Sequence, residues 1–488
     1  EFRRVLFRSP ISGSAYTYAY TSLGEIVAWI LGWNLLLEYA ISNVAVAISW
    51  SKYFVDLLEG LGIHVPEFLT MDYLSAKRAF ITAQEALQQG QLLRDLSVNV
   101  REGFMAYTSA PVILGWHFVA NLPALLITVG ITYLVYIGIR ESKNMNNILV
   151  VLKLGVIAIV IGVGAFYVQV ENWTPFAPNG ISGVLKSVAA VCFAYIGFDS
   201  ISTTAEECKN PQRDIPKAMM WALIICTVLY VLVTLVLTGI VPSSQLAGIE
   251  DPLAFMFMKV NLPGVAGVVA ASAVIALTSA LLVYQLGQPR IWMTMSRDGL
   301  LPKAFSRIHP TYRTPSFSTI MTGVLVGVPA LFANLEEVIN LSSIGTLFAF
   351  VLVCGGVLIL DLDPENQKKS KFKIPYVNAG YWVGICLLIT LYLSFPNIEA
   401  VSLWFSGIFT GENKADHVIM GGFILIWAVL SVFSIRNKLS LIPVLGLLVN
   451  LYLMTQMGAM NWERFLYWCL AGILIYFGYS YRKSKLHI

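Results

Sequence analysis

About twelve stretches of this sequence are apolar over about 20 residues, the length that a helix needs to cross a bilayer. They lie near residues 22–58, 119–140, 145–170, 182–207, 217–241, 264–290, 316–333, 338–360, 379–396, 417–435, 439–457 and 463–480. Hydrophobic residues make up 57% of the chain and charged residues only 12%, a balance that soluble domains do not show. We therefore predict an all-α polytopic membrane protein, because helices satisfy their own backbone groups in lipid.

Basic residues gather in alternate loops between these segments. These loops lie near residues 140–143, 209–217, 290–313, 368–373, 436–438 and 482–485. The opposite short loops hold only Lys259, Lys414 and Arg464. Because lysine and arginine accumulate in cytoplasmic loops, we expect the C-terminus and the start of the first segment to lie in the cytoplasm. The longer segment 59–118 is then an external loop, with a polar helical stretch over residues 73–96.

One apolar run is interrupted by the stretch VCFAYIGFDSISTTAEE, residues 191–207. Gly197 frees the backbone, Asp199 places a carboxylate at membrane depth, and the following serines and threonines can satisfy backbone groups that leave the helix. Unpaired peptide groups survive in lipid only where they are buried in protein or line a cavity. We expect a broken helix beside a cavity at about mid-depth, whose free carbonyls can receive an ammonium group. A helix that is merely kinked at Gly197 is the alternative.

Two further ionisable side chains lie inside apolar segments, Glu38 and Lys153. Lys153 is about eight residues from the start of its segment, which is about 12 Å at 1.5 Å per residue. A charge at this depth favours a helix face turned to the bundle interior and a role in titration or charge compensation. Snorkelling of Lys153 to the interface is the alternative, and Glu38 can equally be a structural pair partner. Tyr284 adds a polar group to another segment, where packing and pocket lining both remain open.

The first nine residues, EFRRVLFRS, do not read as protein. They can be back-translated in frame as a common sequencing-library adapter, so we exclude residues 1–9 from fold reasoning. An amphipathic basic leader is the alternative. We expect the natural protein to start upstream of Pro10.

Several motifs in a fixed order resemble the cationic amino acid transporter branch of the amino acid/polyamine/organocation superfamily of permeases. They are SGSAYTYAY (12–20), LEYAISNVAVA (37–47), the membrane lysine Lys153, FAYIGFDSISTTAEECKNPQRDIPKA (193–218) and QPRIWMTMSRDGLLPKAF (288–305). The resemblance extends from about residue 12 to the C-terminus. It implies a secondary active transporter of L-amino acids.

The resemblance also implies a five-plus-five inverted-repeat fold of fourteen helices, of which the first two precede this chain. Residues 10–170 would hold spans 3–5 of the first repeat, residues 182–360 spans 6–10 of the second, and residues 379–488 four additional spans. In this scheme Glu38 lies in the third helix and Tyr284 in the eighth. The missing first helix would supply the amides that bind the substrate carboxylate, so the chain as given is expected to hold half a binding site.

For the site itself, the resemblance implies that the carbonyls of Phe193, Ala194 and Ile196 hold the substrate ammonium beside Gly197. The ring of Phe193 would cover the substrate from outside. Lys153 would stand where sodium-coupled relatives bind their ion, which implies proton coupling. No metal or other cofactor is expected.

The substrate is expected to be a small or medium neutral L-amino acid such as alanine. In relatives that carry arginine or lysine the position that matches Tyr284 is small, and here the phenol ring would fill that space. Glu38 favours the alternative, a cationic amino acid, because a nearby carboxylate suits a cationic side chain. Exchange instead of proton symport is a further alternative.

Other classes of protein fit less well. A membrane-embedded enzyme would need converging His, Asp or Cys side chains, but the five histidines are scattered, the six cysteines read as small core residues, and the acidic run at residues 361–365 reads as a solvated loop rather than a metal site. A sensor would need larger cytoplasmic regions, and a channel would not need a membrane lysine. We expect a multi-pass protein of the cytoplasmic membrane that contacts lipid, amino acids and protons but no nucleic acid, as a monomer or dimer.

Overall fold

A computed structural model describes residues 16, 19–20, 23–113, 115–138, 143–195, 197–198, 201, 208, 210–246, 249, 251–362, 376–394, 402, 406 and 414–484. The α-helices are α3 (Glu25–Gly60), α4 (Tyr73–Gln88), α5 (Val98–Ser109), α6 (Leu122–Tyr136), α7 (Lys143–Gly164), α8 (Gly180–Val191), α9 (Pro211–Ile240), α10 (Pro252–Lys259), α11 (Pro263–Arg297), α12 (Ser316–Phe332), α13 (Leu335–Asp361), α15 (Trp382–Ser394), α17 (Lys414–Asn437), α18 (Leu441–Thr455), α19 (Ala459–Ile475) and α20 (Tyr481–Lys483). Short 3₁₀ and π turns join them, and β1 (Val112–Ile113) pairs with β2 (Trp116–His117).

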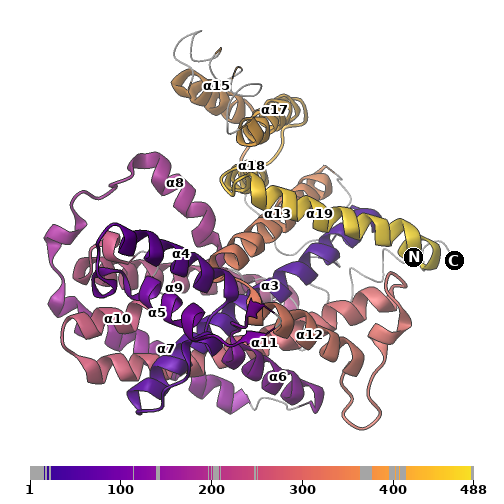
Figure 1. Cartoon of the computed structure of the whole chain (residues 1–488). Coiled ribbons are helices and arrows are strands. Elements are labelled where there is room, and N and C mark those ends of the chain that lie inside the picture. Colours follow the sequence, from indigo (N-terminus) through magenta and orange to yellow (C-terminus); the bar gives the residue numbers. More distant parts are fainter. Residues whose placement is uncertain are drawn as a thin grey trace.

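Each of the apolar segments predicted to cross a membrane contains a helix, from α3 to α19 (Figure 1). Among the described residues, six helices are long and apolar enough to span: α3, α7, α9, α11, α13 and α17. A seventh span results if α18 and the helical segment after it, which are bent by 113° at the break between them, count as one. Among the described residues the predicted number of about twelve spans is therefore not confirmed by length, since α6, α8, α12 and α15 are shorter than about 20 residues and α18 and α19 count as at most one span.

Two long helices, α3 and α11, form the centre of the bundle. They pack along each other, and α6, α12 and α13 pack around them. Ala40, Val44 and Ala47 of α3 are buried against Leu281 of α11 and Val326 of α12. Two glutamine side chains of α11 hydrogen-bond to neighbouring helices. Gln288 Nε2 donates to the Leu36 carbonyl of α3 (3.2 Å), and Gln285 Nε2 donates to Thr132 Oγ1 of α6 (3.2 Å). In contrast, α15 and α17 contact mainly each other and α18, and they stand away from this centre in Figure 1.

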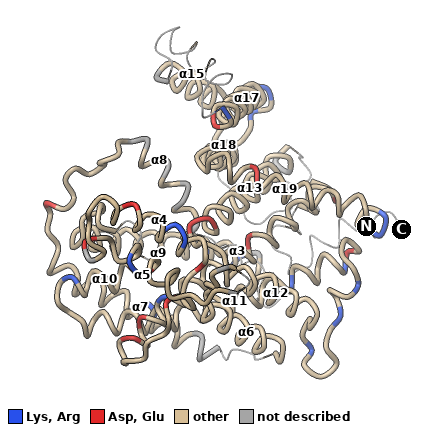
Figure 2. The backbone as a smooth tube through the Cα atoms, viewed as in Figure 1, with Lys and Arg blue, Asp and Glu red and all other residues tan. Residues whose placement is uncertain are grey.

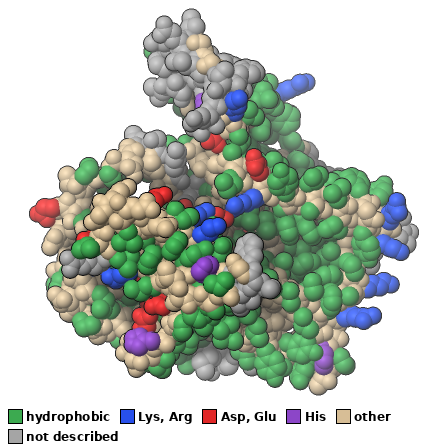
Figure 3. Space-filling model, viewed as in Figure 1, with side chains coloured by type: hydrophobic (Ala, Val, Ile, Leu, Met, Phe, Trp, Pro, Cys, Tyr) green, Lys and Arg blue, Asp and Glu red, His purple; other side chains and the backbone are tan. Residues whose placement is uncertain are grey.

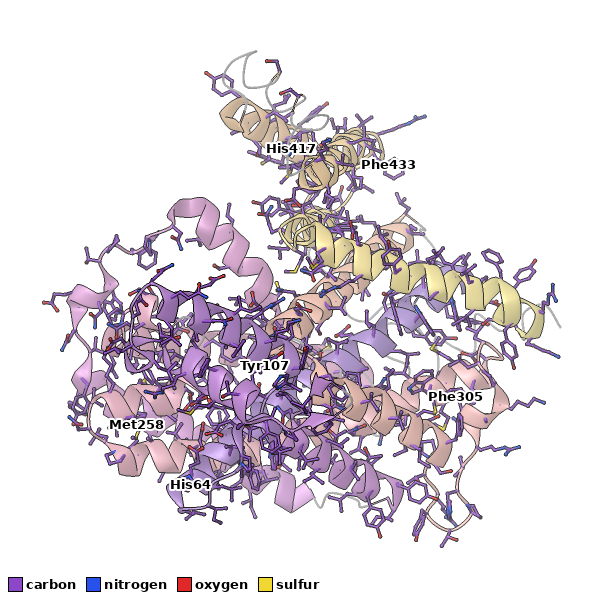
Figure 4. All side chains as sticks on the ribbon, viewed as in Figure 1. His64, Tyr107, Met258, Phe305, His417 and Phe433 are labelled. Carbon is purple, nitrogen blue, oxygen red and sulfur yellow. The ribbon has the colours of Figure 1, made fainter. Side chains whose placement is uncertain are left out.

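Residues 59–118 form a cap over one end of α3. The predicted helical stretch 73–96 is present as α4 but ends at Gln88, because Gly90 takes a positive φ of 82° and Gln91 N bonds back to Ala86 O. The predicted all-α class is confirmed, and the cap adds only the short hairpin β1–β2, which turns at Gly115 (φ 82°). Tyr107, labelled in Figure 4, stacks on His117 of this hairpin with ring centroids 4.2 Å apart.

A charged cluster fastens the cap to the bundle. Lys52 near the end of α3 lies 3.5 Å from Asp56 and 3.2 Å from Glu102 of α5. Asp251, just before α10, interacts with the same lysine. Burial raises the pKa of the Asp251 carboxyl, and the positive charge of Lys52 opposes this rise.

The opposite end of α3 meets both the end of α11 and the last residues of the chain. Tyr16 donates to Asp298 Oδ2 (2.8 Å), directly after α11, and Tyr476 donates to Glu25 Oε1 (3.1 Å) at the start of α3. Ser484 also donates to Glu25, through Oγ. Figures 2 and 3 show a row of Lys and Arg at this edge, next to the chain ends and α12. The basic loops between residues 290 and 313 thus share one end of the bundle with the C-terminal residues, as their charge predicted.

The C-terminal helix α19 docks on α3 through an aromatic seam. Trp33 of α3 and Trp468 of α19 stack with ring centroids 4.5 Å apart, and each indole N–H donates to the other's carbonyl (2.9 and 3.3 Å). Trp29 Nε1 donates to the Gly472 carbonyl (2.8 Å). A Cβ at Gly472 would lie 2.4 Å from Trp33 Cδ1, so the seam depends on a residue without a side chain at this position.

We expect Gly472→Ala to destabilise the protein by about 1–3 kcal/mol, the cost of overpacking a close-packed interface. The measurement is the melting temperature of the purified protein in detergent. Gly478→Ala is the matched control, because nothing lies within 4 Å of the added Cβ there. Equal melting temperatures for the two variants would show that the seam does not stabilise the fold.

Candidate functional site

The interruption predicted at residues 191–207 begins where α8 ends. The α-helical geometry stops at Val191, a 3₁₀ turn follows over Cys192–Tyr195, and Gly197 has a φ of 108°. Because L-residues with a side chain rarely adopt this φ, glycine is required at this point. The described residues therefore show a helix that leaves α geometry at the predicted place. Ile196 and Asp199 lie outside the described residues.

Helix α9 supports the 3₁₀ turn from one side. Tyr230 of α9 donates from its hydroxyl to the Ala194 carbonyl (2.7 Å), and the Tyr195 and Thr227 hydroxyls are 3.0 Å apart. The rings of Tyr195 and Tyr230 meet edge to face, with centroids 5.3 Å apart. One of the carbonyls predicted to hold an ammonium group thus already accepts a hydrogen bond, which leaves its second lone pair for a ligand.

Tyr284 of α11 lies directly against the break. A Cβ built on Gly197 would be 3.2 Å from Tyr284 Oη. Sequence reasoning thus identified two residues, 87 positions apart, that the fold brings into contact. The bundle holds the Tyr284 ring in place, since Tyr39 of α3 meets it edge to face with centroids 5.7 Å apart. Tyr39 is 1% exposed and was not singled out from the sequence, because a tyrosine in an apolar segment carries no signal that separates packing from function.

Helix α13 closes the site on another side. The rings of Phe198, just after the break, and Phe350 of α13 have centroids 5.5 Å apart. Phe350 was also missed, because its position in an apolar segment reads as ordinary packing. The break therefore lies between Tyr284 of α11 and Phe350 of α13.

Glu38 is almost fully buried, at 1% exposed, on the central helix α3. It shares a face with Asn34 and Ser42, one turn away on either side. Asn34 contacts Cys469 of α19 (3.8 Å) and Ser42 hydrogen-bonds Ser342 of α13 (2.9 Å). The carboxylate is thus on the face of α3 that meets α13 and α19, whereas its neighbour Tyr39 meets α11.

Lys153 lies on the inward face of α7. It is half-buried, and so are Val156 and Ile157, one turn further along, while Val160 is 1% exposed. Most residues between them on the helix are exposed. This spacing of three, four and seven residues is one helix face, so Lys153 shares a face with the less exposed residues of α7. Helix α7 packs against α9 and α11, where Val160 is buried in a cluster with Val236 of α9 and Val269 of α11.

The break brings together a backbone that has left its helix and aromatic rings from two flanking helices, Tyr284 of α11 and Phe350 of α13. The buried carboxylate of Glu38 lies on another face of α3 than Tyr39, the residue that contacts Tyr284. The side chain of Phe193, predicted to cover the substrate, is not among those described. No group of three or more His, Cys, Asp or Glu suited to a metal ion occurs within the described residues.

Comparison with known proteins places these features in context. Residues 7–475 match the family model described as "Amino acid permease". The branched-chain amino acid permease BcaP of Bacillus subtilis is 38% identical over 81% of this chain and 77% of its own length. The methylthioribose transporter of the same organism is 37% identical over 80% and 76%. The vacuolar cationic amino acid transporter 4 of Arabidopsis thaliana is 29% identical over 98% and 83%.

Proposed function

The chain belongs to the amino acid permease family, and from this premise we propose that it is a proton-coupled symporter of small or medium neutral L-amino acids. Membership makes it a multi-pass membrane transporter related to amino acid carriers. The proposal adds the substrate class, the coupling ion and the cytoplasmic membrane as location, with the basic edge and the C-terminus facing the cytoplasm.

One observation supports the substrate site above the others: the helix break at Gly197 lies against Tyr284. Backbone carbonyls at a break carry partial negative charge and suit an ammonium group. The proposed ligands are the carbonyls of Phe193, Ala194 and Ile196. The phenol of Tyr284 narrows the space beside them, which favours a short side chain on the substrate.

Proton coupling is proposed for Lys153. A lysine turned inward on a membrane helix is costly unless it serves a purpose. As its surroundings change between the two orientations of a carrier, its ammonium can release or rebind a proton and so link that movement to the proton gradient.

The packing of the central helices is compatible with the proposed five-plus-five inverted repeat. If α3, α6 and α7 correspond to α11, α12 and α13, a twofold axis in the membrane exchanges their contacts. Accordingly α3 packs on α12 and α13, and α11 packs on α6 and α7. The pair α3 and α11, related to each other by this axis, forms the longest interface along the bundle centre and has nearly equal lengths of 36 and 35 residues.

A cationic amino acid is the second candidate. The buried carboxylate of Glu38 favours it, and the names of several relatives refer to cationic amino acids. Glu38 lies on the face of α3 where Ser42 hydrogen-bonds Ser342 of α13. A substrate bound at the break can therefore contact Glu38 only if the pocket extends toward α13.

The substrate proposal predicts that Tyr284→Ser shifts preference from alanine toward arginine. Removing the ring frees space for a long side chain, and pocket changes of this kind alter selectivity by about 10- to 200-fold. The measurement is the ratio of radiolabelled arginine to alanine uptake in proteoliposomes. Tyr392→Ser is the matched control, because Tyr392 is 75% exposed on α15. If Tyr284→Ser retains alanine uptake with an unchanged ratio, Tyr284 does not line the pocket.

A further inference from the structure

A cavity lies away from the helix break, where the cap meets the bundle. Its volume is about 300 Å³, and its walls are mostly apolar. Ile41 and Val44 of α3 contribute to its walls, with Leu74 of α4, Phe332 of α12 and Val338 of α13 around them. Such walls favour an alkyl chain over a polar solute.

The cavity also has a charged boundary. Glu337, near the start of α13, lies between two guanidinium groups: Arg78 of α4 is 3.2 Å from its Oε1 and Arg464 of α19 is 3.2 Å from its Oε2. Glu337 and Arg464 line the cavity. One carboxylate cannot neutralise two guanidiniums, so the trio carries a net charge of about +1. Arg464 keeps 38% of its side chain exposed and can reach a further anion.

The position of the cavity matches the end of the membrane-spanning helices on the cap side. Helix α12 ends at Phe332 and α13 begins at Leu335, so the turn between them forms part of the wall. Phe332 is 50% exposed and Val328, one turn before it, is 52% exposed, so apolar surface adjoins this wall of the cavity. Figure 3 shows basic and acidic side chains together in this region, between α4 and α13 of Figure 1, with hydrophobic surface around them.

We propose that this cavity binds one acyl chain of an anionic phospholipid from the cap-side leaflet, with the lipid phosphate against Arg464. The apolar walls suit the acyl chain, and the net positive charge of Arg78, Glu337 and Arg464 suits the anionic headgroup. Because the cavity lies at the ends of membrane-spanning helices, one phospholipid can place its chain and its headgroup there together. A free phosphate would leave the apolar walls unfilled. A zwitterionic lipid would bring a cation toward Arg78 and Arg464, which opposes its binding.

The bound lipid would join elements that the protein itself connects by few contacts. Asn334, in the turn after α12, donates to Ser75 Oγ of α4 (2.7 Å), and the two ion pairs of Glu337 link α4 to α13 and α19. A phosphate on Arg464 would add a fourth charged group to this junction. The lipid is thus expected to hold the cap on the bundle, whichever substrate the protein carries.

The test is competition between phosphatidylglycerol and phosphatidylcholine for the purified full chain, followed by native mass spectrometry at several salt concentrations. One cation near a membrane surface is worth about a fivefold preference for an anionic lipid. We expect phosphatidylglycerol to bind about fivefold more tightly, with the preference falling as salt rises. Equal binding of the two lipids by the wild-type protein would overturn the proposal without any variant.

Two substitutions in the trio should act in opposite directions. Arg464→Gln removes the excess charge and should abolish the preference, whereas Glu337→Gln raises the net charge to about +2 and should increase it. Arg307→Gln, an exposed arginine at the opposite end of α11, should leave the preference unchanged. A loss of preference in all three variants, or an unchanged preference in Arg464→Gln, would place the lipid elsewhere.

The apolar part of the site is tested by filling it. Ala333, which lines the cavity at the end of α12, is half-buried, so Ala333→Phe should occupy part of the space. We expect fewer retained phosphatidylglycerol molecules per protein, with the melting temperature in lipid-free detergent close to that of the wild type. Unchanged lipid retention in a folded Ala333→Phe protein would contradict occupancy by an acyl chain.

Discussion

We expect Lys153→Gln to reduce the accumulation of alanine driven by a pH gradient by at least about tenfold. A tenfold change corresponds to a free-energy difference of about 1.4 kcal/mol. The physical reason is that a glutamine on the inward face of α7 cannot release or rebind a proton. Binding and exchange of substrate need no net proton movement, so counterflow of labelled alanine should persist. The measurement compares gradient-driven uptake with counterflow in the same proteoliposomes.

Lys153→Arg separates charge from titration. Arginine keeps the positive charge but does not deprotonate in proteins, so it should fail in gradient-driven uptake as glutamine does. Lys414→Gln, an exposed lysine at the start of α17, is the control and should transport normally. Full accumulation by Lys153→Arg would mean that the lysine supplies only a fixed charge, and coupling would then have to be sought at another group such as Glu38.

Much of the fold follows from patterns that operate within a few residues. The apolar segments were predicted from their length, and the structure has a helix in each of them. The loops rich in lysine and arginine were predicted to share one side of the protein, and they lie at the end of the bundle where Tyr16, Asp298 and the C-terminal residues meet. The features of the fold that the sequence did not predict depend on tertiary contacts or on the backbone conformation of single glycines. The 113° bend between α18 and α19 occurs at Gly458, whose φ is 76°. A lone glycine between two apolar segments cannot reveal the angle at which the chain turns.

The candidate site shows the same division. Gly197 and Lys153 were recognisable because glycine and charge are unusual at membrane depth. Tyr39 and Phe350 were not, because aromatic residues are common in apolar segments and their roles depend on which helix they face. Glu38 is intermediate: its burial was expected, but its face toward α13 is set by the packing of α3, which periodicity alone does not determine.

The sharpest structural test of the site is Gly197→Ala. Its φ of 108° is strained for alanine, at about 1–3 kcal/mol, and the new Cβ would lie 3.2 Å from Tyr284 Oη. We expect alanine uptake to fall about tenfold or more, because the carbonyls around the break would be displaced. Gly162→Ala in α7 is the matched control, since nothing lies within 4 Å of its added Cβ.

The double variant Gly197→Ala with Tyr284→Phe distinguishes the two causes of this loss. Removing the phenol hydroxyl relieves the close contact but leaves the backbone strain. If uptake remains low in the double variant, the unusual backbone at Gly197 is what the site requires. If uptake recovers relative to the single variant, the contact with Tyr284 sets the shape of the pocket. Uptake by Gly197→Ala equal to that of Gly162→Ala would contradict both, because the substrate would then bind away from the break.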